Sequence, residues 1–352
     1  MGRTRIRVGA ATDVGRTRSH NEDNYGLRVP DAGEVADRKG ILLVICDGMG
    51  GHAAGEVASQ LAVETILTRY YDSPADDPTE ALIQAVTLAN QKIFQQAAER
   101  PEQRGMGTTC VAVVLRGDEL TVAHVGDSRA YLLRNGVLTR LTRDHSLVEE
   151  WVEKGVLPAA EADHHPMANV ITRALGHGPT VQVEVRQERA LLGDILMLCS
   201  DGLSGKVSEE AMRATLLQQA DPKAAVADLI ALANDAGGSD NISVIVARIE
   251  EIAPAGASAN GDALEPTGRQ TLRLAARARD DPSPRPMTTA AERAAAPSGR
   301  TLVIRGCSFV AAAALAVLLV IALVVAGALL GWIPGLRLVD AVPFWPSVAT
   351  FR

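Results

Sequence analysis

Residues 107–141 form a series of short apolar runs separated by turn residues, GTTCVAVVLRGDELTVAHVGDSRAYLLRNGVLTRL. The interruptions fall at Arg116-Gly117-Asp118, at Gly126-Asp127 and at Asn135-Gly136, and Asn-Gly is the dipeptide most typical of a two-residue hairpin turn. Short apolar runs between such turns predict antiparallel strands in a meander. Further strands are predicted at residues 41–46, 181–188, 195–200 and 243–249.

Longer stretches with apolar residues at helical spacing occupy residues 54–70, 78–98, 208–219 and 222–236. The predicted strands cluster between these pairs of helices, with no regular alternation of strand and helix. This order favours an α+β fold of two packed antiparallel sheets flanked by helices over a doubly wound parallel sheet.

The composition changes abruptly near Ile252. Residues 252–305 are rich in Ala, Pro, Gly, Ser, Thr and Arg and have no sustained helical or alternating pattern. Such a composition is typical of a flexible linker. We therefore expect a folded domain at residues 1–251, followed by the linker at residues 252–305.

Residues 306–336 carry no charge, and within them CSFVAAAALAVLLVIALVVAGALLGWI is long enough to cross a bilayer as a helix. We expect a transmembrane helix at residues 306–333 and a short extracytoplasmic tail at residues 334–352; a buried helix of a globular domain is the alternative. Arginine is frequent before this segment and scarce after it, which predicts a single-pass protein of the cytoplasmic (inner) membrane with its large N-terminal part in the cytoplasm. The arginines are Arg285, Arg293, Arg300 and Arg305 before the segment, and Arg337 and Arg352 after it.

The charge and the cysteine content argue against several classes of protein. The formal net charge is −7 and the pI is about 5.6, whereas nucleic-acid binders hold phosphate backbones with clustered lysine and arginine, so no nucleic-acid partner is expected. The four cysteines are far apart and form no C-x-x-C pair, so neither a disulfide framework nor a thiolate zinc site is indicated. The first residues, MGRTRIRVGAATDVGRTRSHNED, lack the apolar core of a signal peptide, in agreement with a cytoplasmic location.

Several acidic residues stand where an apolar run ends, next to glycine. Asp47 precedes Gly48 in LLVICDGMGG, and Asp201 precedes Gly202 in the similar run LMLCSDGLSG. One Asp-Gly pair alone is most often only a turn, but two carboxylates that end two strands can converge at one end of a sheet. Asp127 in Val-Gly-Asp-Ser and Asp240 in Gly-Ser-Asp-Asn are of the same kind, and Glu22 and Asp23 add two carboxylates from the polar run Arg-Ser-His-Asn-Glu-Asp.

Clustered carboxylates repel one another unless a cation lies between them. Oxygen-only ligands select hard cations, so we expect Mn²⁺ or Mg²⁺ rather than zinc. Two such ions bridged by one carboxylate indicate attack of a metal-activated water on phosphorus, a reaction that requires no nucleophilic serine or cysteine.

The ordered motifs R-x-x-N-E-D, D-G-M-G-G, G-T-T, G-D-S-R, S-D-G and D-N-I-S resemble the bacterial branch of the metal-dependent type 2C protein phosphatases. The resemblance covers residues from about Arg5 to Glu250 and does not extend to the linker or the apolar segment. It implies hydrolysis of phosphoserine and phosphothreonine, and a four-layer α-β-β-α sandwich in which helix pairs cover both outer faces of two antiparallel sheets.

The resemblance also implies roles for individual residues. Asp47 matches the carboxylate that bridges the two metal ions, and the carbonyl of Gly48 matches a ligand of one ion. Asp201 and Asp240 match ligands of the other ion.

Four more residues take roles from the same resemblance. Glu22 and Asp23 match residues that hold water molecules on the ions, and Arg18 matches the arginine that binds phosphate, for which its planar fork of donors is suited. Asp127 resembles the ligand that, with Asp201, completes a third and weaker metal site in bacterial members.

The sequence departs from the family pattern at the position of a possible general acid. Some members have a histidine directly after Asp-Gly, where this chain has Met49, while His52 lies three residues later. A metal-bound water is the preferred acid, with His52 as the alternative. For His145 we expect a structural hydrogen bond.

Residues 147–178 correspond to the variable flap of the family, and the name flap is used for them below. The flap contains His164, His165 and His177. Solvated side chains and contact with the substrate both remain open for these histidines.

The function expected from the sequence is hydrolysis of phosphoserine and phosphothreonine on cytoplasmic proteins near the membrane, opposing serine/threonine kinases. Three alternatives stay open: a catalytically silent phosphoprotein-binding module, a metal-dependent phosphoesterase for small molecules, and a membrane scaffold. The second remains because metal ligands determine the chemistry, whereas the flap determines the substrate.

Overall fold

The computed structural model describes residues 4–31, 38–50, 54–162 and 165–253. All of these residues belong to the first of two units into which the chain divides, residues 1–277 and 278–352. The predicted transmembrane segment, the tail and the linker beyond Ala253 lie outside the described residues. Within the described part of the chain, no helix has the length and apolar character needed to span a bilayer.

The described strands form two sheets, and all their pairings are antiparallel. The first sheet has the strand order β1 (Arg5–Asp13), β11 (Ile242–Glu251), β10 (Ile195–Cys199), β7 (Arg129–Arg134), β8 (Val137–Arg140). The second has the order β2 (Asp23–Arg28), β3 (Ile41–Met49), β5 (Cys110–Arg116), β6 (Glu119–Val125), β9 (Glu184–Arg189), and β4 (Gly107–Thr108) pairs with the end of β3. Two antiparallel sheets flanked by helices were predicted, and that part of the prediction is confirmed.

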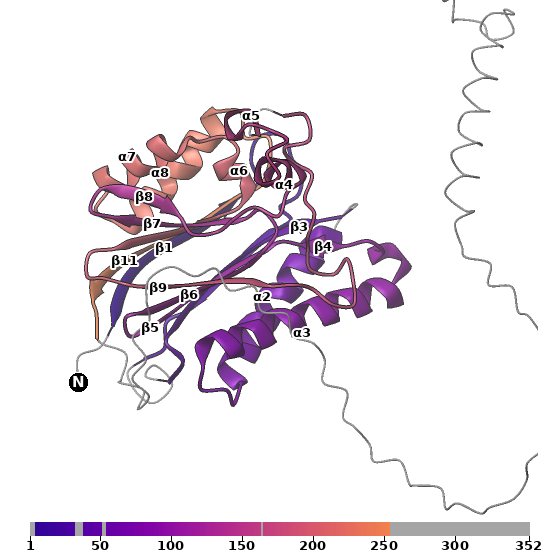
Figure 1. The fold of residues 1–352 in the computed structure, drawn as a ribbon, viewed down its shortest axis with the longest axis horizontal. Coiled ribbons are helices and arrows are strands. Elements are labelled where there is room, and N and C mark those ends of the chain that lie inside the picture. The colour runs from indigo at the N-terminus through magenta and orange to yellow at the C-terminus, as the bar shows by residue number, and fades with distance from the viewer. Residues whose placement is uncertain (1–3, 32–37, 51–53, 163–164, 254–352) are drawn as a thin grey trace, which may run out of the picture. The chain divides into compact units, whose positions relative to one another are not determined.

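Helix pairs cover the outer faces of the two sheets. Figure 1 shows α7 and α8 outside the first sheet and α2 and α3 outside the second. Asp77, Ser208 and Asp221 cap α3, α7 and α8, each accepting a hydrogen bond from a backbone N–H of the first turn. The helices are α2 (Ala54–Asp72), α3 (Pro78–Glu99), α4 (Leu147–Glu153), α5 (Ala159–Ala162), α6 (Asp201–Ser204), α7 (Glu209–Gln218) and α8 (Pro222–Asp235), with a 3₁₀ turn η1 (Pro101–Gln103).

Three apolar clusters separate these layers. Because side chains alternate between the two faces of a strand, β3 contributes to two of the clusters. Leu42 and Val44 pack beneath α2 and α3, whereas Leu43 and Ile45 pack between the sheets. Val246 of β11 belongs to the third cluster, beneath α7 and α8. The chain order and these clusters explain why β3, β10 and β11 are apolar on both faces.

The predicted meander is correct for two hairpins but wrong at the middle turn. β5 pairs with β6, and β7 pairs with β8. Between β6 and β7, at Gly126-Asp127, the chain instead crosses from the second sheet to the first. Gly126 has φ +102°, and a Cβ there would lie 2.7 Å from the Cγ2 of Thr109, so glycine is required for this crossing.

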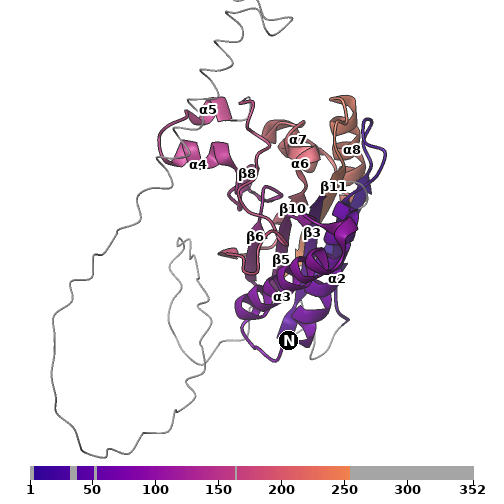
Figure 2. The same cartoon turned by 90° about the vertical axis from the view of Figure 1, so that its right-hand side faces the viewer.

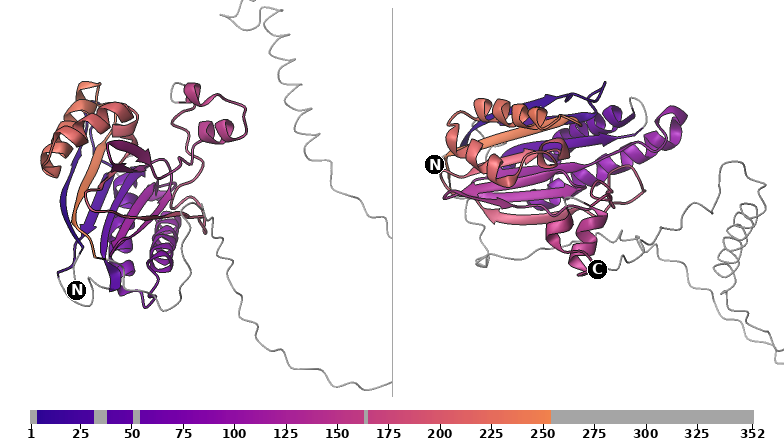
Figure 3. Two further views of the ribbon diagram at one scale, coloured as in Figure 1. Left: turned by 60° about the vertical axis from the view of Figure 1, so that its left-hand side comes forward. Right: turned by 90° about the horizontal axis from the view of Figure 1, so that it is seen from above.

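Element boundaries agree closely with the predictions for the long helices, and the differences have identifiable causes. β3 continues through Asp47 to Met49 because β4 pairs with Gly48 and Met49. The strands β1 and β2 were not predicted, and neither were α4 and α5 of the flap. Figures 2 and 3 show that the flap helices stand beside the sandwich rather than within its layers.

Candidate metal centre

The acidic residues singled out in the sequence lie at one end of the two sheets. Asp23, the first residue of β2, is the cross-strand partner of Asp47 near the end of β3. Asp201 directly follows β10, and Asp240 stands just before β11. Asp127 lies in the crossing between the sheets. The antiparallel topology therefore brings carboxylates from both sheets to the same end of the sandwich.

Burial and mutual repulsion make these carboxylates difficult to ionise together. Burial, followed by the charges of Asp23, Asp201 and Asp127, raises the pKa of Asp47 well above its ordinary value. Burial raises the pKa of Asp23 to about 7, although the Ser200 hydroxyl opposes the shift. Burial and the charge of Asp201 raise the pKa of Asp127 to about 7, and the pKa of Asp201 is raised by burial and by Asp240. The arrangement lacks positive charge at its centre.

Within the part of the chain that the structure describes, two buried carboxylate oxygens have no hydrogen-bond partner. They are the Oδ1 atoms of Asp23 and Asp201. The other oxygen of Asp23, Oδ2, accepts a hydrogen bond of 2.7 Å from the hydroxyl of Ser200, which fixes the orientation of the carboxylate. Unsatisfied buried carboxylate oxygens next to one another are costly unless a cation is bound, and an all-oxygen donor set fits a hard divalent cation. The residues present therefore fit the metal centre predicted from the sequence.

Arg18 and Glu22 lie at the rim of this carboxylate group. Nη2 of Arg18 donates a hydrogen bond of 2.8 Å to Oδ2 of Asp240, and the Arg18 side chain is half exposed. Burial raises the pKa of Glu22, whereas Arg18 lowers it. The long, solvent-facing guanidinium can therefore reach a group that enters from solvent.

Gly48 is fixed by close backbone packing. Its N–H donates a hydrogen bond of 3.1 Å to the carbonyl of Glu22. A Cβ on Gly48 would lie 2.2 Å from the carbonyl oxygen of Gly55 and 2.4 Å from that of Glu22. Only glycine allows β3 to approach the loop before β2 this closely.

Asn241, for which the sequence predicted no role, organises the loop that carries Arg18 and Glu22. Its Nδ2 donates to the carbonyls of Val14 and His20 at 3.0 and 2.9 Å, and its Oδ1 accepts from the N–H of Glu22 at 2.8 Å. The side chain is 5% exposed, so these bonds are largely shielded from water. Its place beside Asp240 in the D-N-I-S motif was the available signal.

Two hydroxyls, also without a predicted role, link Asp47 to the crossing that carries Asp127. The N–H of Asp47 donates to Oγ1 of Thr109 at 2.9 Å, and this oxygen lies 2.7 Å from Oγ of Ser128. Both side chains are buried. The contact joins the second sheet, before β5, to the first sheet, before β7.

The histidines differ in what the structure shows. His145 is buried and makes the predicted structural hydrogen bonds, which are described below. His165 packs edge-on against Trp151 of α4, and His177 is exposed. His52 and His164 lie outside the described residues, so the identity of the general acid stays a prediction.

Comparisons with known proteins agree with this geometry. A sequence model of the family described as "Protein phosphatase 2C" matches residues 16–233. The serine/threonine protein phosphatase PstP of Mycobacterium tuberculosis is 40% identical over 247 residues, which are 69% of this chain and 45% of PstP, so the match spans less than half of that relative. The serine/threonine phosphatase stp of Listeria innocua is 38% identical over 239 residues, 67% of this chain and 92% of that protein.

A solved structure gives the same result for the fold. The catalytic domain of PstP in complex with two manganese ions has a TM-score of 0.60 and 39% identity to this chain, over 70% of this chain and 98% of that domain. The matched family model covers more than half of the chain. The chain therefore belongs to the protein phosphatase 2C family, in the branch of the bacterial serine/threonine phosphatases.

Proposed function

We propose that this protein hydrolyses phosphoserine and phosphothreonine in proteins and depends on divalent cations. The observation that carries the proposal is the group of buried carboxylates from two sheets, with unpartnered oxygens on Asp23 and Asp201. Family membership supports the reaction type. The two manganese ions in the PstP structure support the choice of Mn²⁺ as a cation, and Mg²⁺ has the same preference for oxygen ligands.

The residues that would hold two ions are those at the strand ends. Asp47 would bridge the ions, the carbonyl of Gly48 would bind one, and Asp201 and Asp240 would bind the other. When bound, such ions supply Lewis-acid activation of water and neutralise charge on the phosphoryl group. Asp127 lies beside Asp201, where it would complete a third site.

Neighbouring side chains would position water and substrate. Glu22 and Asp23 would hold water ligands, and the Ser200 hydroxyl keeps Asp23 oriented for this task. Arg18 would bind the phosphoryl oxygens with its fork of N–H donors. In the described structure this guanidinium is bound to Asp240, so a cation on Asp240 would free it for the substrate.

We extend the proposal to the cellular context predicted from the sequence, in which the enzyme is tethered to the cytoplasmic membrane and opposes serine/threonine kinases there. β11 begins beside the carboxylates and ends at Glu251, at the opposite end of the sheets. A tether raises the effective concentration of the enzyme at membrane substrates. Unchanged dephosphorylation of membrane proteins in cells by a chain truncated before Ala253 would contradict this extension.

The activity is tested by phosphate release from a phosphothreonine peptide by the full chain in detergent. We expect turnover with Mn²⁺ or Mg²⁺, none with a chelator, and loss of turnover in the Asp201→Asn variant. A nucleotide substrate run in parallel tests the alternative of a small-molecule phosphoesterase. A folded protein without activity under any metal would refute the proposal and favour the silent binding module.

A further inference from the structure

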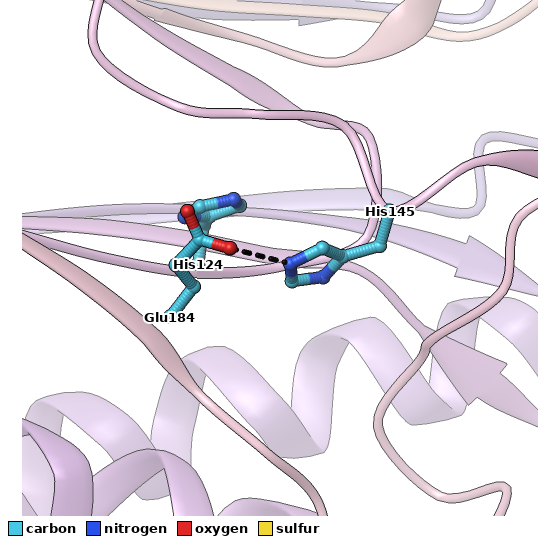
Figure 4. A group of neighbouring side chains, drawn as sticks. All are labelled: His124, His145 and Glu184. Atoms are coloured by element: carbon cyan, nitrogen blue, oxygen red, sulfur yellow. Dashed lines mark hydrogen bonds and ion pairs between the residues drawn. The ribbon is translucent and has the colours of Figure 1, made fainter. Parts of the chain in front are cut away.

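Two histidines and a glutamate form a compact buried group next to the crossing that carries Asp127. Among the described residues, the ligand atoms of His124, His145 and Glu184 all lie within 4.8 Å of one another. The two imidazole rings stack with their centroids 4.8 Å apart. Figure 4 shows the carboxylate of Glu184 directed at the ring of His145. The composition alone would suit a transition-metal ion.

The hydrogen bonds of the group argue against a metal ion. Nε2 of His124 lies 2.6 Å from the carbonyl oxygen of Arg143, which can only accept, and 3.3 Å from the N–H of Arg143; the shorter contact favours a proton on this nitrogen. The N–H of Gly126 donates to Nδ1 of His145 at 3.1 Å, while Nε2 of His145 lies 3.3 Å from both Oε2 of Glu184 and Nη1 of Arg173. A metal ion on Nε2 would lie against the positive guanidinium of Arg173, and a ring proton on Nδ1 would break the bond from the Gly126 N–H.

His145 instead binds both peptide groups of Gly126. Its own N–H donates to the carbonyl of Gly126 at 3.0 Å, while its ring accepts from the Gly126 N–H. Gly126 precedes Asp127 and has the positive φ needed for the crossing between the sheets. Asp144, the residue before His145, is fixed as well, since it accepts hydrogen bonds from Nε and Nη2 of Arg129 at 3.0 and 2.6 Å. Asp144 and His145, just before the flap, therefore hold the residues on either side of Asp127: Arg129 after it and Gly126 before it.

The same residue closes the base of the flap. The carbonyl of His145 accepts a hydrogen bond of 2.7 Å from the N–H of Thr172. Ser146 forms a β-bridge with Ile171, and the N–H of Leu147 donates to the carbonyl of Val170 at 2.8 Å. The chain enters the flap directly after His145 and comes back to His145 at Thr172, and α4 and α5 lie between these two residues.

We propose that His145 is a positioning residue that couples the base of the flap to the Gly126-Asp127 crossing. Its ring, oriented by Glu184, holds the peptide before Asp127, and its main chain holds the end of the flap. A change at the base of the flap is then transmitted to Asp127 through the hydrogen bonds of His145, beside the ion pair of Asp144 and Arg129. The kinetic part of the test rests on the proposed phosphatase function, whereas the structural part does not.

Two substitutions separate the contacts of the ring. His145→Leu removes the acceptor for the Gly126 N–H and the contacts of Nε2 with Glu184 and Arg173, and it leaves a buried backbone N–H unsatisfied. His145→Asn keeps an acceptor near the position of Nδ1 and removes the contacts with Glu184 and Arg173. Met212→Ala is the matched control, because Met212 is a fully buried residue of α7 and its truncation destabilises the fold away from the flap.

The first measurement is hydrogen exchange of the full chain in detergent, with and without Mn²⁺. We expect His145→Leu to accelerate exchange at the amides of Gly126, Leu147 and Thr172, and His145→Asn to retain the protection of Gly126. The Met212→Ala variant should leave all three amides as in the parent. Unchanged exchange in a folded His145→Leu variant would overturn the proposal; if that variant does not fold, loss of Gly126 protection in His145→Asn would overturn it.

The second measurement is the Mn²⁺ dependence of phosphatase activity. Loss of one buried hydrogen bond predicts that His145→Leu needs about tenfold more Mn²⁺ for half-maximal activity. His145→Asn should restore most of this difference, a rescue that general destabilisation does not explain. An equal rise in the Met212→Ala control would refute the coupling. A parent without activity would refute the proposed function and leave the exchange result as the test of His145.

Discussion

Replacing Asp23 with asparagine is expected to stabilise the metal-free protein at pH 8. Asp23 is 4% exposed, and burial raises its pKa from the ordinary value of 3.8 to about 7. Asparagine has nearly the same shape, and its carbonyl can still accept from Ser200. Its amide group points where the unpartnered Oδ1 now lies, among carboxylates that can accept from it.

The sign follows from the two protonation states. The unfolded chain ionises Asp23 near pH 3.8 and the folded protein near pH 7, so the metal-free protein loses stability as the pH rises through this window. The loss is fully present above about pH 7. A pKa raised by about three units, at about 1.4 kcal/mol per unit, corresponds to a loss of about 4 kcal/mol in the free energy of unfolding of the parent. The Asp23→Asn variant does not suffer this loss. Removal of the Asp23 charge also eases the ionisation of Asp47, which adds to the stability of the variant at pH 8.

The assay is denaturant unfolding of the full chain in chelator at pH 4, 6 and 8. Parent and Asp23→Asn should be similar at pH 4, and the variant should be the more stable at pH 8. Excess Mn²⁺ should reduce or reverse the difference, because the cation stabilises the parent carboxylates. Glu102→Gln, at an exposed position in η1, is the control and should change stability by less than about 0.5 kcal/mol. A variant less stable than the parent at pH 8, or a difference independent of pH, would refute the reasoning.

Three further substitutions test the rim and the backbone of the site. Arg18→Lys should raise the KM for a phosphopeptide about tenfold, measured by steady-state kinetics, because lysine cannot form the bidentate contact. Asn241→Leu leaves the N–H of Glu22 and two carbonyls unsatisfied, so urea unfolding should show a loss of about 3 kcal/mol, with a lower kcat. Gly48→Ala should cost about 3 kcal/mol in the same unfolding assay, because its Cβ would meet backbone oxygens at 2.2 and 2.4 Å.

The parts of the fold that were predictable have strong local signals. The long helices α3 and α8 begin with Asp-Pro, in which aspartate caps the helix and proline takes the first turn. The strands β3, β10 and β11 are apolar on both faces because clusters lie on both sides of them. By contrast β1 is an edge strand with several exposed residues, and its assignment depends on pairing with β11, more than 200 residues away in sequence.

The crossing at Gly126 shows a second limit. The turn there is visible in the sequence, but turn chemistry does not determine whether the next strand pairs with the last one or joins another sheet. For the site, Asp47, Asp127 and Asp201 were predictable because each stands beside glycine near a strand end, and Glu22, Asp23 and Asp240 because they belong to the ordered motifs. Asn241, Thr109 and Ser128 were not assigned roles, because their partners lie in distant parts of the chain.

Polar links between the two sheets surround the carboxylates. Each link joins a residue near the end of one sheet to a residue near the end of the other, and none needs a cation. The links are Ser200 to Asp23, Asn241 to Glu22, and Thr109 to Ser128.

These links determine how a cation should act on the protein. The carboxylates come from both sheets, so without a cation their repulsion tends to separate the sheets at this end, against the hydrogen bonds and the apolar cluster between the sheets. Because the hydrogen bonds already fix Asp23 and the backbone of Asp47, the donor atoms are held in place before any ion binds. A bound cation would then release electrostatic strain between carboxylates, and its binding energy would appear as added stability of the sandwich.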